Sequence, residues 1–316
     1  MRRPDVSVVI PTYNYGRYIG EAVESALRQT LPPLEIIVVD DGSTDNTQSE
    51  LRSFAGRITY HRQENSGVSA ARNRGIRAAR GEWIAMLDAD DIWRPEKLAL
   101  QMQCALNYPE VVLIGGLNQN ADTAESRCGC EMYTLFSVED FLCALPFGTS
   151  SAVARRESLI RCGLFKEKRR LAEDRELWLK LVLTGPAARV NAAVWEYRHH
   201  SGQSILQARR MAENYAEILR EFFKAHPEYR AQKTAALAYF DYDSAMAYHE
   251  TGANLPALGH TLRSFIRFPY SLEVPGAEAR FDRRTLLLKS LVGKTGFEKV
   301  RNLLKRGAGR RPAAAT

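Results

Sequence analysis

Short apolar runs alternate with stretches of helical periodicity over the first two hundred residues of the chain. The predicted strands cover residues 6–10, 35–40, 58–61 and 82–87. Most are apolar over nearly their whole length, as parallel strands covered on both faces should be. In residues 17–29, Ile19, Val23 and Ala26 recur at helical spacing. This alternation predicts an α/β fold with a Rossmann-like, mostly parallel, doubly wound sheet and flanking helices.

Later elements of this part of the chain are less regular. Further helices are predicted at residues 95–106, 137–145, 156–161 and 171–183, and strands at 111–114 and 188–197. Residues 118–135 show no clear period and are predicted to be a loop. Residues 148–153 are small and polar and give little signal.

From about residue 205 the pattern becomes helical. One predicted helix ends at His226, and two more cover residues 231–250 and 255–266. We therefore expect three parts. They are a first domain at residues 1–205, a helical C-terminal region at 206–306 with a basic amphipathic tail, and a disordered end at 307–316.

The composition is that of a globular protein, 45% apolar and 26% charged. No apolar run approaches the ~18 residues of a membrane span. The N-terminal residues lead straight into the first strand without a signal-peptide core. Five cysteines, an odd number, favour reduced thiols over a metal site built on Cys128 and Cys130. A cytoplasmic protein is expected.

Positive charge is concentrated near the end of the chain. The net charge is +7, yet residues 283–311 alone contain ten Arg or Lys and one acid, Glu298, which gives a local charge of +9. The rest of the chain is therefore slightly acidic. This distribution favours a local anionic partner and argues against nucleic-acid binding, since the basic residues are not interleaved with a series of base-stacking aromatics.

Leucines such as Leu287 and Leu291 stand among the basic residues of this tail, which is interrupted by Gly293 and Gly296. Such a segment can lie on an anionic membrane surface, which would make the protein peripheral on the cytoplasmic face. Two other interpretations stay open. The tail can dock on the body with a solvated basic face, or the C-terminal helices can form a homodimer.

The strand at residues 82–87 is followed by three carboxylates, Asp88, Asp90 and Asp91. Such a cluster is costly to bury unless a cation or a hydrogen-bond network compensates it. Mg²⁺ and Mn²⁺ favour carboxylate sites of this kind, completed by phosphate oxygens and water. One carboxylate can also hold the metal while another binds a sugar hydroxyl. The alternative is a solvated Asp-rich turn.

Polar residues directly follow three of the predicted strands. They are Tyr13, Asp41 and the Asp88/Asp90 pair. Because ligands of such sheets bind beyond the carboxyl ends of the strands, we expect these residues to face one crevice.

Two further candidates lie later in the chain. Glu173 and Asp174 open a predicted helix, where the helix dipole alone favours acids. His200, beside His199, is a candidate metal ligand, although adjacent histidines usually lie at the surface.

Five segments, in this order and spacing, resemble the family 2 glycosyltransferases of the GT-A fold. They are residues 6–14, 38–45, 65–75, 87–91 and 172–178. The resemblance covers about the first 205 residues. It implies an enzyme that transfers a sugar from a nucleotide-diphosphate donor with inversion at the anomeric carbon, using Mn²⁺ or Mg²⁺.

The resemblance also implies roles for individual residues. Asp174 matches the catalytic base and Asp90 the metal ligand, with His200 at the metal or the diphosphate. Asp41 matches a residue that contacts the base in uridine-type donors, which favours UDP- or dTDP-linked sugars. The residues implied to bind the nucleotide sugar are Pro11, Tyr13, Asn14, Asp41, Arg72, Asn73 and Asp88.

A surface glycan of bacterial type, or its lipid-linked precursor, is the expected acceptor, because the basic tail can reach the membrane where such acceptors lie. Two other classes of protein match these residues less well. A sugar nucleotidyltransferase would begin with a Gly-rich phosphate loop after its first strand, whereas this chain has residues 11–14, Pro-Thr-Tyr-Asn. A non-catalytic nucleotide-sugar-binding module would not need both Asp90 and Asp174.

Overall fold

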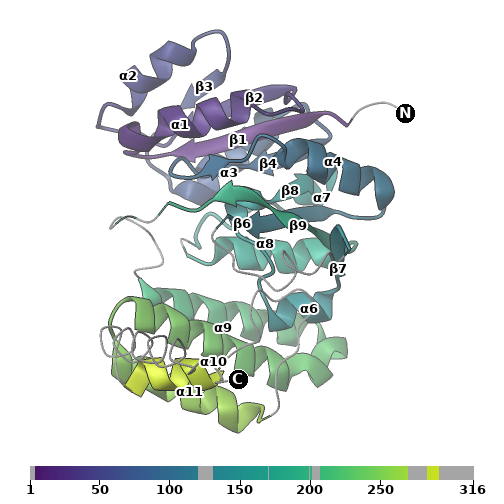
Figure 1. Ribbon diagram of the computed structural model, residues 1–316, viewed down its shortest axis with the longest axis vertical. Helices are drawn as coiled ribbons and strands as arrows, with labels where there is room; N and C mark the ends of the chain where they lie inside the picture. The colour runs from purple at the N-terminus through teal and green to yellow at the C-terminus, as the bar shows by residue number, and fades with distance from the viewer. Residues whose placement is uncertain are drawn as a thin grey trace, which may run out of the picture. The chain divides into compact units, whose positions relative to one another are not determined.

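The computed structural model describes residues 4–119, 131–169, 171–198, 200, 207–269 and 283–291. It contains two compact units, one ending at His200 and one that holds the described residues from 207 onward (Figure 1). The first is an α/β unit and the second is helical, as the sequence predicts. The predicted domain boundaries after residues 205 and 306 lie outside the described residues and stay predictions.

The described strands of the first unit form one nine-stranded sheet in the order β3-β2-β1-β4-β8-β6-β9-β5, with β7 paired to β9 (Figure 1). Neighbours among β3, β2, β1 and β4 are parallel, and β8 runs antiparallel between β4 and β6. The strands are β1 (Val6–Thr12), β2 (Glu35–Asp40), β3 (Thr59–Arg62), β4 (Trp83–Met86), β5 (Ile92–Trp93), β6 (Leu113–Asn118), β7 (Tyr133–Phe136), β8 (Val153–Arg155) and β9 (Ala187–Glu196).

Parallel pairing brings the carboxyl ends of β1, β2 and β4 to one edge of the sheet. Thr12 at the end of β1 pairs with Asp40 at the end of β2, and Val9 pairs with Met86 at the end of β4. The backbone N–H of Leu87 then donates to Val9 O at 3.1 Å. The loops that follow these three strands therefore leave the sheet at the same edge.

Three short strands were not predicted from the sequence. The prediction of a loop over residues 118–135 is wrong for β7, while residues 120–130 lie outside the described part. β8 and β5 were also missed. These three strands carry no detectable period of their own, and they exist because other strands, above all β9, offer them a partner. β8 is an antiparallel addition between β4 and β6, and the predicted α/β fold with a mostly parallel sheet and flanking helices is confirmed.

The helices of the first unit cover the sheet. They are α1 (Gly16–Leu27), α2 (Thr47–Leu51), α3 (Val68–Ala78), α4 (Lys97–Asn107), α6 (Val138–Cys143), α7 (Arg156–Arg161) and α8 (Glu173–Val182), with short turns η1 (Arg52–Phe54) and η2 (Thr149–Ser151). Ile19, Val23 and Ala26 of α1 are fully buried, as their spacing predicts. In α3, a Cβ on Gly75 would lie 2.4 Å from a methyl carbon of Val9. This helix therefore lies directly on β1.

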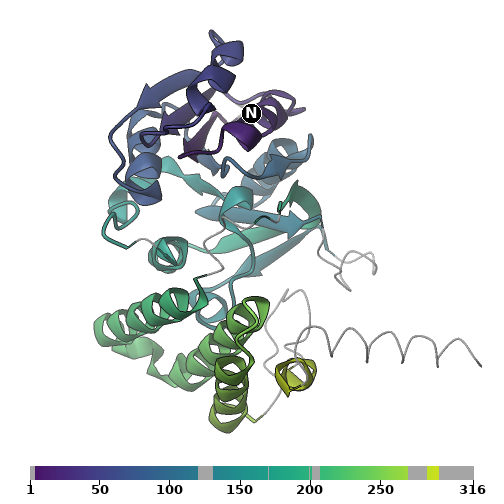
Figure 2. The same ribbon diagram turned by 90° about the vertical axis from the view of Figure 1, so that its left-hand side faces the viewer.

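The second unit consists of α9 (Ala208–Ala225), η4 (Pro227–Gln232), α10 (Lys233–Glu250), α11 (Asn254–Arg267) and helical residues 283–291. α10 packs against both α9 and α11 (Figures 1 and 2). Asp241 of α10 is fully buried, 2.8 Å from His260 Nδ1 and 3.3 Å from Arg263 Nε of α11. Arg283 donates to Ser264 O at 2.9 Å. Charged contacts thus tie these helices together.

The predictions of reduced cysteines and of no membrane-spanning segment can be compared with the structure only over the described residues. Cys104, Cys143 and Cys162 are free thiols, while Cys128 and Cys130 lie outside the described residues. Within the described ranges, no helix is both long enough and apolar enough to cross a membrane. The basic tail is described only over residues 283–291, and the rest of it lies outside.

Candidate functional site

Residues 88–91, the acid loop, follow β4 and contain Asp88, Asp90 and Asp91. Ser150 of η2 supports it, because its hydroxyl accepts the backbone N–H of Asp88 at 3.1 Å and donates to Asp91 Oδ2 at 2.5 Å. Asp91 is 2% exposed, whereas the side chains of Asp88 and Asp90 are 30% and 14% exposed. Asp91 therefore anchors the loop, and Asp88 and Asp90 remain open to a ligand.

Arg72 reaches the acid loop from α3. Its side chain is 5% exposed and donates to Asp88 Oδ1 and to Glu173 Oε1, both at 2.6 Å. Burial opposes the charged form, but the two carboxylates outweigh burial and raise the pKa of Arg72. Its guanidinium also lies 5.2 Å from the centre of the Phe165 ring. Arg72 thus joins the acid loop to the first turn of α8.

Asp90 and His200 meet although 110 residues separate them, with 2.8 Å between Asp90 Oδ2 and His200 Nε2. The imidazole stacks on Tyr18 at 5.1 Å between ring centres, and Tyr15 meets it edge-on at 5.8 Å. Arg198 donates to the backbone oxygen of Asp90. The two aromatic rings and this hydrogen bond hold the imidazole and the carboxylate in their mutual orientation.

Negative charge accumulates at this loop. Burial, with the charge of Asp88, raises the pKa of Asp90, although the hydrogen bond from His200 lowers it. Burial first, and Asp88 second, raise the pKa of Asp91 to about 8. Burial and the same acids raise the pKa of Tyr15. A partly buried carboxylate cluster of this kind is stabilised by added positive charge.

The residues present suit a divalent cation bound together with an anionic ligand. A carboxylate oxygen and an imidazole nitrogen are ligand types that Mn²⁺ accepts. In the part of the chain that the structure describes, no group of three or more His, Cys, Asp or Glu could form a complete protein cage. Mg²⁺ and Mn²⁺ often take one or two protein ligands and fill their remaining positions with substrate phosphate oxygens and water. Arg72 Nε is buried and meets no acceptor among the described residues, which fits a nearby anion.

Asp174 lies in the first turn of α8 and is half-buried. Its Oδ2 accepts the Thr149 hydroxyl at 2.9 Å, and its Oδ1 accepts the Arg175 backbone N–H at 2.8 Å. The preceding Glu173 is 9% exposed. Burial raises the pKa of Glu173 against the opposing effect of Arg72, and Asp174 adds to the rise. Of the two acids, Asp174 is the more open to a ligand.

The predicted nucleotide-binding residues at the end of β1 differ in their surroundings. Pro11 is buried within the strand, and Tyr13 is 44% exposed. Asn14 has a left-handed backbone with φ 58°. Its Oδ1 accepts the backbone N–H of Thr44 at 2.8 Å, and its own N–H donates to Ser43 Oγ at 2.9 Å. Asn14 therefore joins the loop after β1 to the loop after β2, and Tyr13 is the open side chain.

Two other predicted binding residues have their polar atoms engaged within the protein. The carboxylate of Asp41, 3% exposed, accepts the backbone N–H groups of Ser66 at 2.9 Å and Gly67 at 2.7 Å. Asn73, 1% exposed, exchanges two hydrogen bonds of 2.9 Å with the backbone of Phe165. Asp41 thus fixes the start of α3. The structure does not bring the Asn73 amide to the acid loop, and its binding role stays a prediction.

Several side chains around the site were not singled out from the sequence. They are Tyr15, Tyr18, Thr149, Ser150 and Arg198. Thr149 and Ser150 belong to residues 148–153, whose small polar side chains show neither a helical nor a strand period. Arg198 stands two positions before His200. The family resemblance implied a role for the histidine and none for the arginine. The sequence around these residues does not indicate which side chains they contact, because their partners lie far away in sequence.

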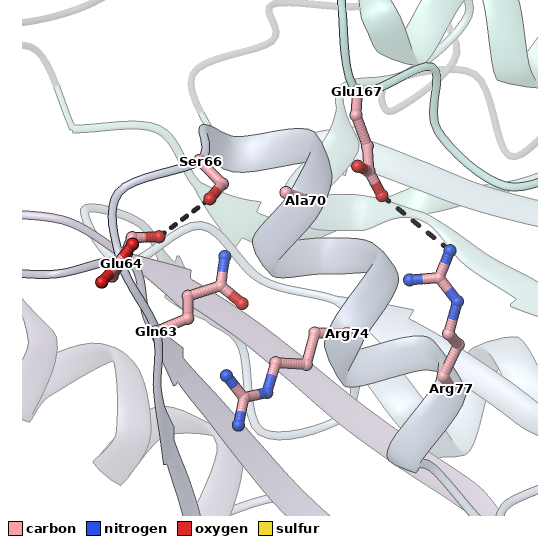
Figure 3. Close-up of a pocket in the computed structure, with 7 residues that line it drawn as sticks. All are labelled: Gln63, Glu64, Ser66, Ala70, Arg74, Arg77 and Glu167. Atoms are coloured by element: carbon pink, nitrogen blue, oxygen red, sulfur yellow. Dashed lines mark hydrogen bonds and ion pairs between the residues drawn. The ribbon is translucent and has the colours of Figure 1, made fainter.

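A separate, open hollow of about 520 Å³ lies along α3. It is lined by Gln63, Glu64, Ser66, Ala70, Arg74, Arg77 and Glu167 (Figure 3). Arg77 lies 3.8 Å from Glu167 there, and both side chains are about half exposed. The hollow contains none of the predicted site residues, and its two arginines are matched by two glutamates.

Comparison of the sequence with known proteins gives consistent matches. The model of "Glycosyl transferase family 2" matches residues 7–127. An uncharacterized glycosyltransferase of Rickettsia typhi is 30% identical over 229 residues, which cover 70% of this chain and 72% of that protein. Some other relatives are longer, and the match spans only 33–35% of their length.

Two solved structures have a similar fold. TarS of S. aureus, in complex with UDP-GlcNAc, has a TM-score of 0.54 and 20% identity over 90% of this chain and 91% of that one. The mannosyltransferase PcManGT of Pyrobaculum calidifontis, in complex with GDP-Man and Mn²⁺, has a TM-score of 0.59 and 23% identity over 92% of this chain and 88% of that one. At these identities the likeness concerns the fold.

Proposed function

Because the chain belongs to glycosyltransferase family 2, we propose that it moves a sugar from a nucleotide-diphosphate donor to an acceptor hydroxyl with inversion at the anomeric carbon. The fold is the GT-A fold. One observation carries the proposal. Arg72 ties Asp88 of the acid loop to Glu173, the neighbour of Asp174, so that the candidate base and the acid loop belong to one site.

Asp174 is proposed as the general base. The acceptor oxygen attacks C1 of the donor sugar from the face opposite the diphosphate, and the hydroxyl proton passes to the Asp174 carboxylate. The bond between C1 and the phosphate oxygen breaks, and its electron pair leaves with the diphosphate. A carboxylate within hydrogen-bond reach can take this proton. The helix dipole at the start of α8 favours a negative charge there.

Asp90 and His200 are proposed to hold Mn²⁺ or Mg²⁺. When bound, the metal would stabilise the charge that develops on the leaving diphosphate. Arg72 is proposed to add a second positive contact to the diphosphate, and Asp88 to bind a ribose or sugar hydroxyl. The cation would also relieve the crowding of carboxylates in the acid loop.

The donor is proposed to be a UDP- or dTDP-linked sugar. Pro11, Tyr13, Asn14 and Asn73 are proposed to surround the nucleotide, and Asp41 to face its base. The structural neighbours TarS and PcManGT were solved with UDP-GlcNAc and with GDP-Man and Mn²⁺. These complexes support a nucleotide-sugar donor and a divalent metal.

The acceptor is proposed to be a growing cell-surface polysaccharide or a lipid-linked glycan at the cytoplasmic face of the membrane. The +9 charge of residues 283–311 supports a peripheral contact with anionic lipid. The alternative use of the C-terminal helices is homodimerisation.

A thermal-shift screen tests the proposal. The purified protein is heated with nucleoside diphosphates and nucleotide sugars in the presence of Mn²⁺, Mg²⁺ or EDTA. We expect a uridine or thymidine nucleotide to raise the melting temperature in the presence of metal only, because a ligand that binds the folded state stabilises it by mass action. No shift with any nucleotide would contradict the proposal.

Asp90→Ala supplies the variant for this screen. It should abolish the metal-dependent shift, since it removes the proposed ligand. Asp140→Ala is the matched control, because Asp140 caps the start of α6 and belongs to no part of the site. A shift that survives in Asp90→Ala would remove Asp90 from the metal site.

A further inference from the structure

We propose that the turn η2 sets the distance between the general base and the donor, with Thr149 positioning Asp174 and Ser150 positioning the acid loop. The inference rests on the proposed function. It gives a role to hydroxyl residues that neither the family pattern nor the predicted site includes. Both are positioning residues, since each acts through a carboxylate.

Two adjacent hydroxyls of η2 contact the two halves of the site. Thr149 Oγ1 donates to Asp174 Oδ2 at 2.9 Å. Ser150 Oγ donates to Asp91 Oδ2 at 2.5 Å and accepts the backbone N–H of Asp88 at 3.1 Å. The candidate base and the acid loop are therefore held by neighbouring residues of one turn.

The backbone of η2 is itself tightly held. Trp93 Nε1 donates to Ser150 O at 2.6 Å, and Gln101 Nε2 donates to Ser151 O at 2.7 Å. Gln101 Oε1 in turn accepts Lys97 Nζ at 2.7 Å, and all three side chains are buried. The turn therefore has little freedom to tilt or to slide along the sheet.

Side-chain packing restricts the turn on its other sides. A Cβ on Gly148, the residue before η2, would lie 2.8 Å from the Trp195 ring of β9. A Cβ on Gly115 of β6 would lie 1.9 Å from the ring of Phe147. The segment that carries η2 is thus packed against β6 and β9, and its hydroxyls are presented from a rigid support.

Such an arrangement matters for an inverting transfer, because the base must lie opposite the leaving diphosphate while the acceptor stands between them. A misplacement of about 1 Å can cost roughly 100-fold in rate. The Thr149 hydroxyl fixes which oxygen of Asp174 is directed at the acceptor. The Ser150 hydroxyl fixes the loop that is proposed to bind the metal and the donor.

The test compares binding with turnover in the full-length protein. Binding is measured by titration of UDP with Mn²⁺, or of the nucleotide that the thermal-shift screen identifies. Turnover is measured as the metal-dependent release of that nucleotide from its sugar, with water as the acceptor. Thr149→Val, Thr149→Ser and Asp174→Asn are compared with the wild type and with the double variant Thr149→Val/Asp174→Asn.

Thr149→Val should lower turnover by about 10- to 100-fold while nucleotide affinity stays within about 2-fold. Thr149→Ser should restore turnover, since it keeps the hydroxyl. The double variant should be no slower than Asp174→Asn, because Thr149 acts through that carboxylate. Thr184→Val, two residues beyond the end of α8, is the matched control and should behave as the wild type.

For Ser150→Ala, the loss is expected in nucleotide affinity. The substitution should weaken nucleotide binding in the presence of Mn²⁺ by about 10- to 100-fold, because it releases the loop that carries the proposed ligand Asp90, and losing an outer partner of a metal site usually has an effect of this size. This measurement needs no turnover. Unchanged binding in Ser150→Ala would overturn its part of the inference.

The remaining outcomes separate the two proposals. Normal turnover in Thr149→Val, together with a strong loss in Asp174→Asn, would overturn the positioning role and leave the proposed function intact. Normal turnover in Asp174→Asn would refute the proposed base itself. A loss in Thr149→Val that adds to the loss in Asp174→Asn would mean that Thr149 does not act through the carboxylate, which also overturns the inference.

Discussion

At the scale of single residues, the most constrained group is the guanidinium of Arg72. The Arg72 side chain is 5% exposed and lies between the side chains of Glu173, 11% exposed, and Asp88, 30% exposed. Burying such charges is costly, and removing one partner leaves another charge unpaired in a place that water reaches poorly. The arrangement therefore favours a function for the charges over stability alone. A bound diphosphate would find a guanidinium that is already charged and already oriented.

Asp174→Asn is the sharpest change at this scale. The variant should bind the nucleotide with metal as the wild type does, because it leaves the acid loop intact. Transfer should fall by at least ~100-fold, since an amide cannot accept the acceptor proton. Steady-state kinetics with the donor from the thermal-shift screen would measure this. Asp140→Asn, an acid in the first turn of α6, is the control and should retain full activity. Near-normal turnover in Asp174→Asn would remove the residue from this role.

At the scale of elements, the strands of the parallel core were predictable, whereas β5, β7 and β8, which pair antiparallel with their neighbours, were not. Residues 35–40 carry their own apolar signal, and β2 has those bounds. β7 and β8 exist because β9, β4 and β6 offer them hydrogen bonds, so their own residues show no period. The site divides in the same way. Each candidate residue was found from local pattern and family resemblance, whereas the contacts of Ser150 and Glu173 depend on chain segments 59 and 101 residues away.

Lys97, at the start of α4, allows a test at this scale. Its side chain is fully buried, and burial lowers its pKa well below the ordinary value of 10.5. The folded protein therefore loses this proton at a lower pH than the unfolded chain does. Between those two pKa values the unfolded chain binds more protons, so the free energy of unfolding rises with pH.

Lys97→Met removes this contribution. Its free energy of unfolding, relative to that of the wild type, should fall as the pH is raised toward 10.5, by up to about 1.4 kcal/mol per pH unit. Urea unfolding at a series of pH values would measure the difference. Lys224→Met on the exposed face of α9 should give a difference that does not change with pH. The same flat result for Lys97→Met would contradict the prediction.

At the scale of the whole molecule, charge is distributed unevenly. The local charge of +9 in residues 283–311 exceeds the net charge of +7 of the entire chain, so the remainder, at −2, is slightly acidic. An anionic surface would therefore attract residues 283–311 and weakly repel the rest of the chain. The tail would then be the part of the protein that contacts a membrane.

Flotation with vesicles tests whether the tail makes this contact. The wild-type protein should float with vesicles that contain anionic lipid at low salt and be released at high salt, because each basic residue contributes about 1 kcal/mol near such a surface. A variant with four charge reversals in the tail should not float; they are Lys299→Glu, Arg301→Glu, Lys305→Glu and Arg306→Glu. Four reversals at exposed arginines elsewhere form the control; they are Arg28→Glu, Arg57→Glu, Arg161→Glu and Arg209→Glu.

The control should keep at least the greater part of the binding, although its net charge is lowered by the same amount. Equal binding of both variants would mean that the tail is not the lipid contact. Self-association of the wild type without lipid, lost in the tail variant alone, would favour the dimer instead.

The hydrogen bonds of Asn14 and Asp41 have a consequence for the energetics of ligand capture. They join the loops after β1, β2 and β3 to one another through groups of the protein itself. Few residues would then have to become ordered when a nucleotide binds, so little conformational entropy would be lost. Calorimetry should accordingly find a small heat-capacity change, and stopped-flow mixing should find one fast association step without a slow folding phase.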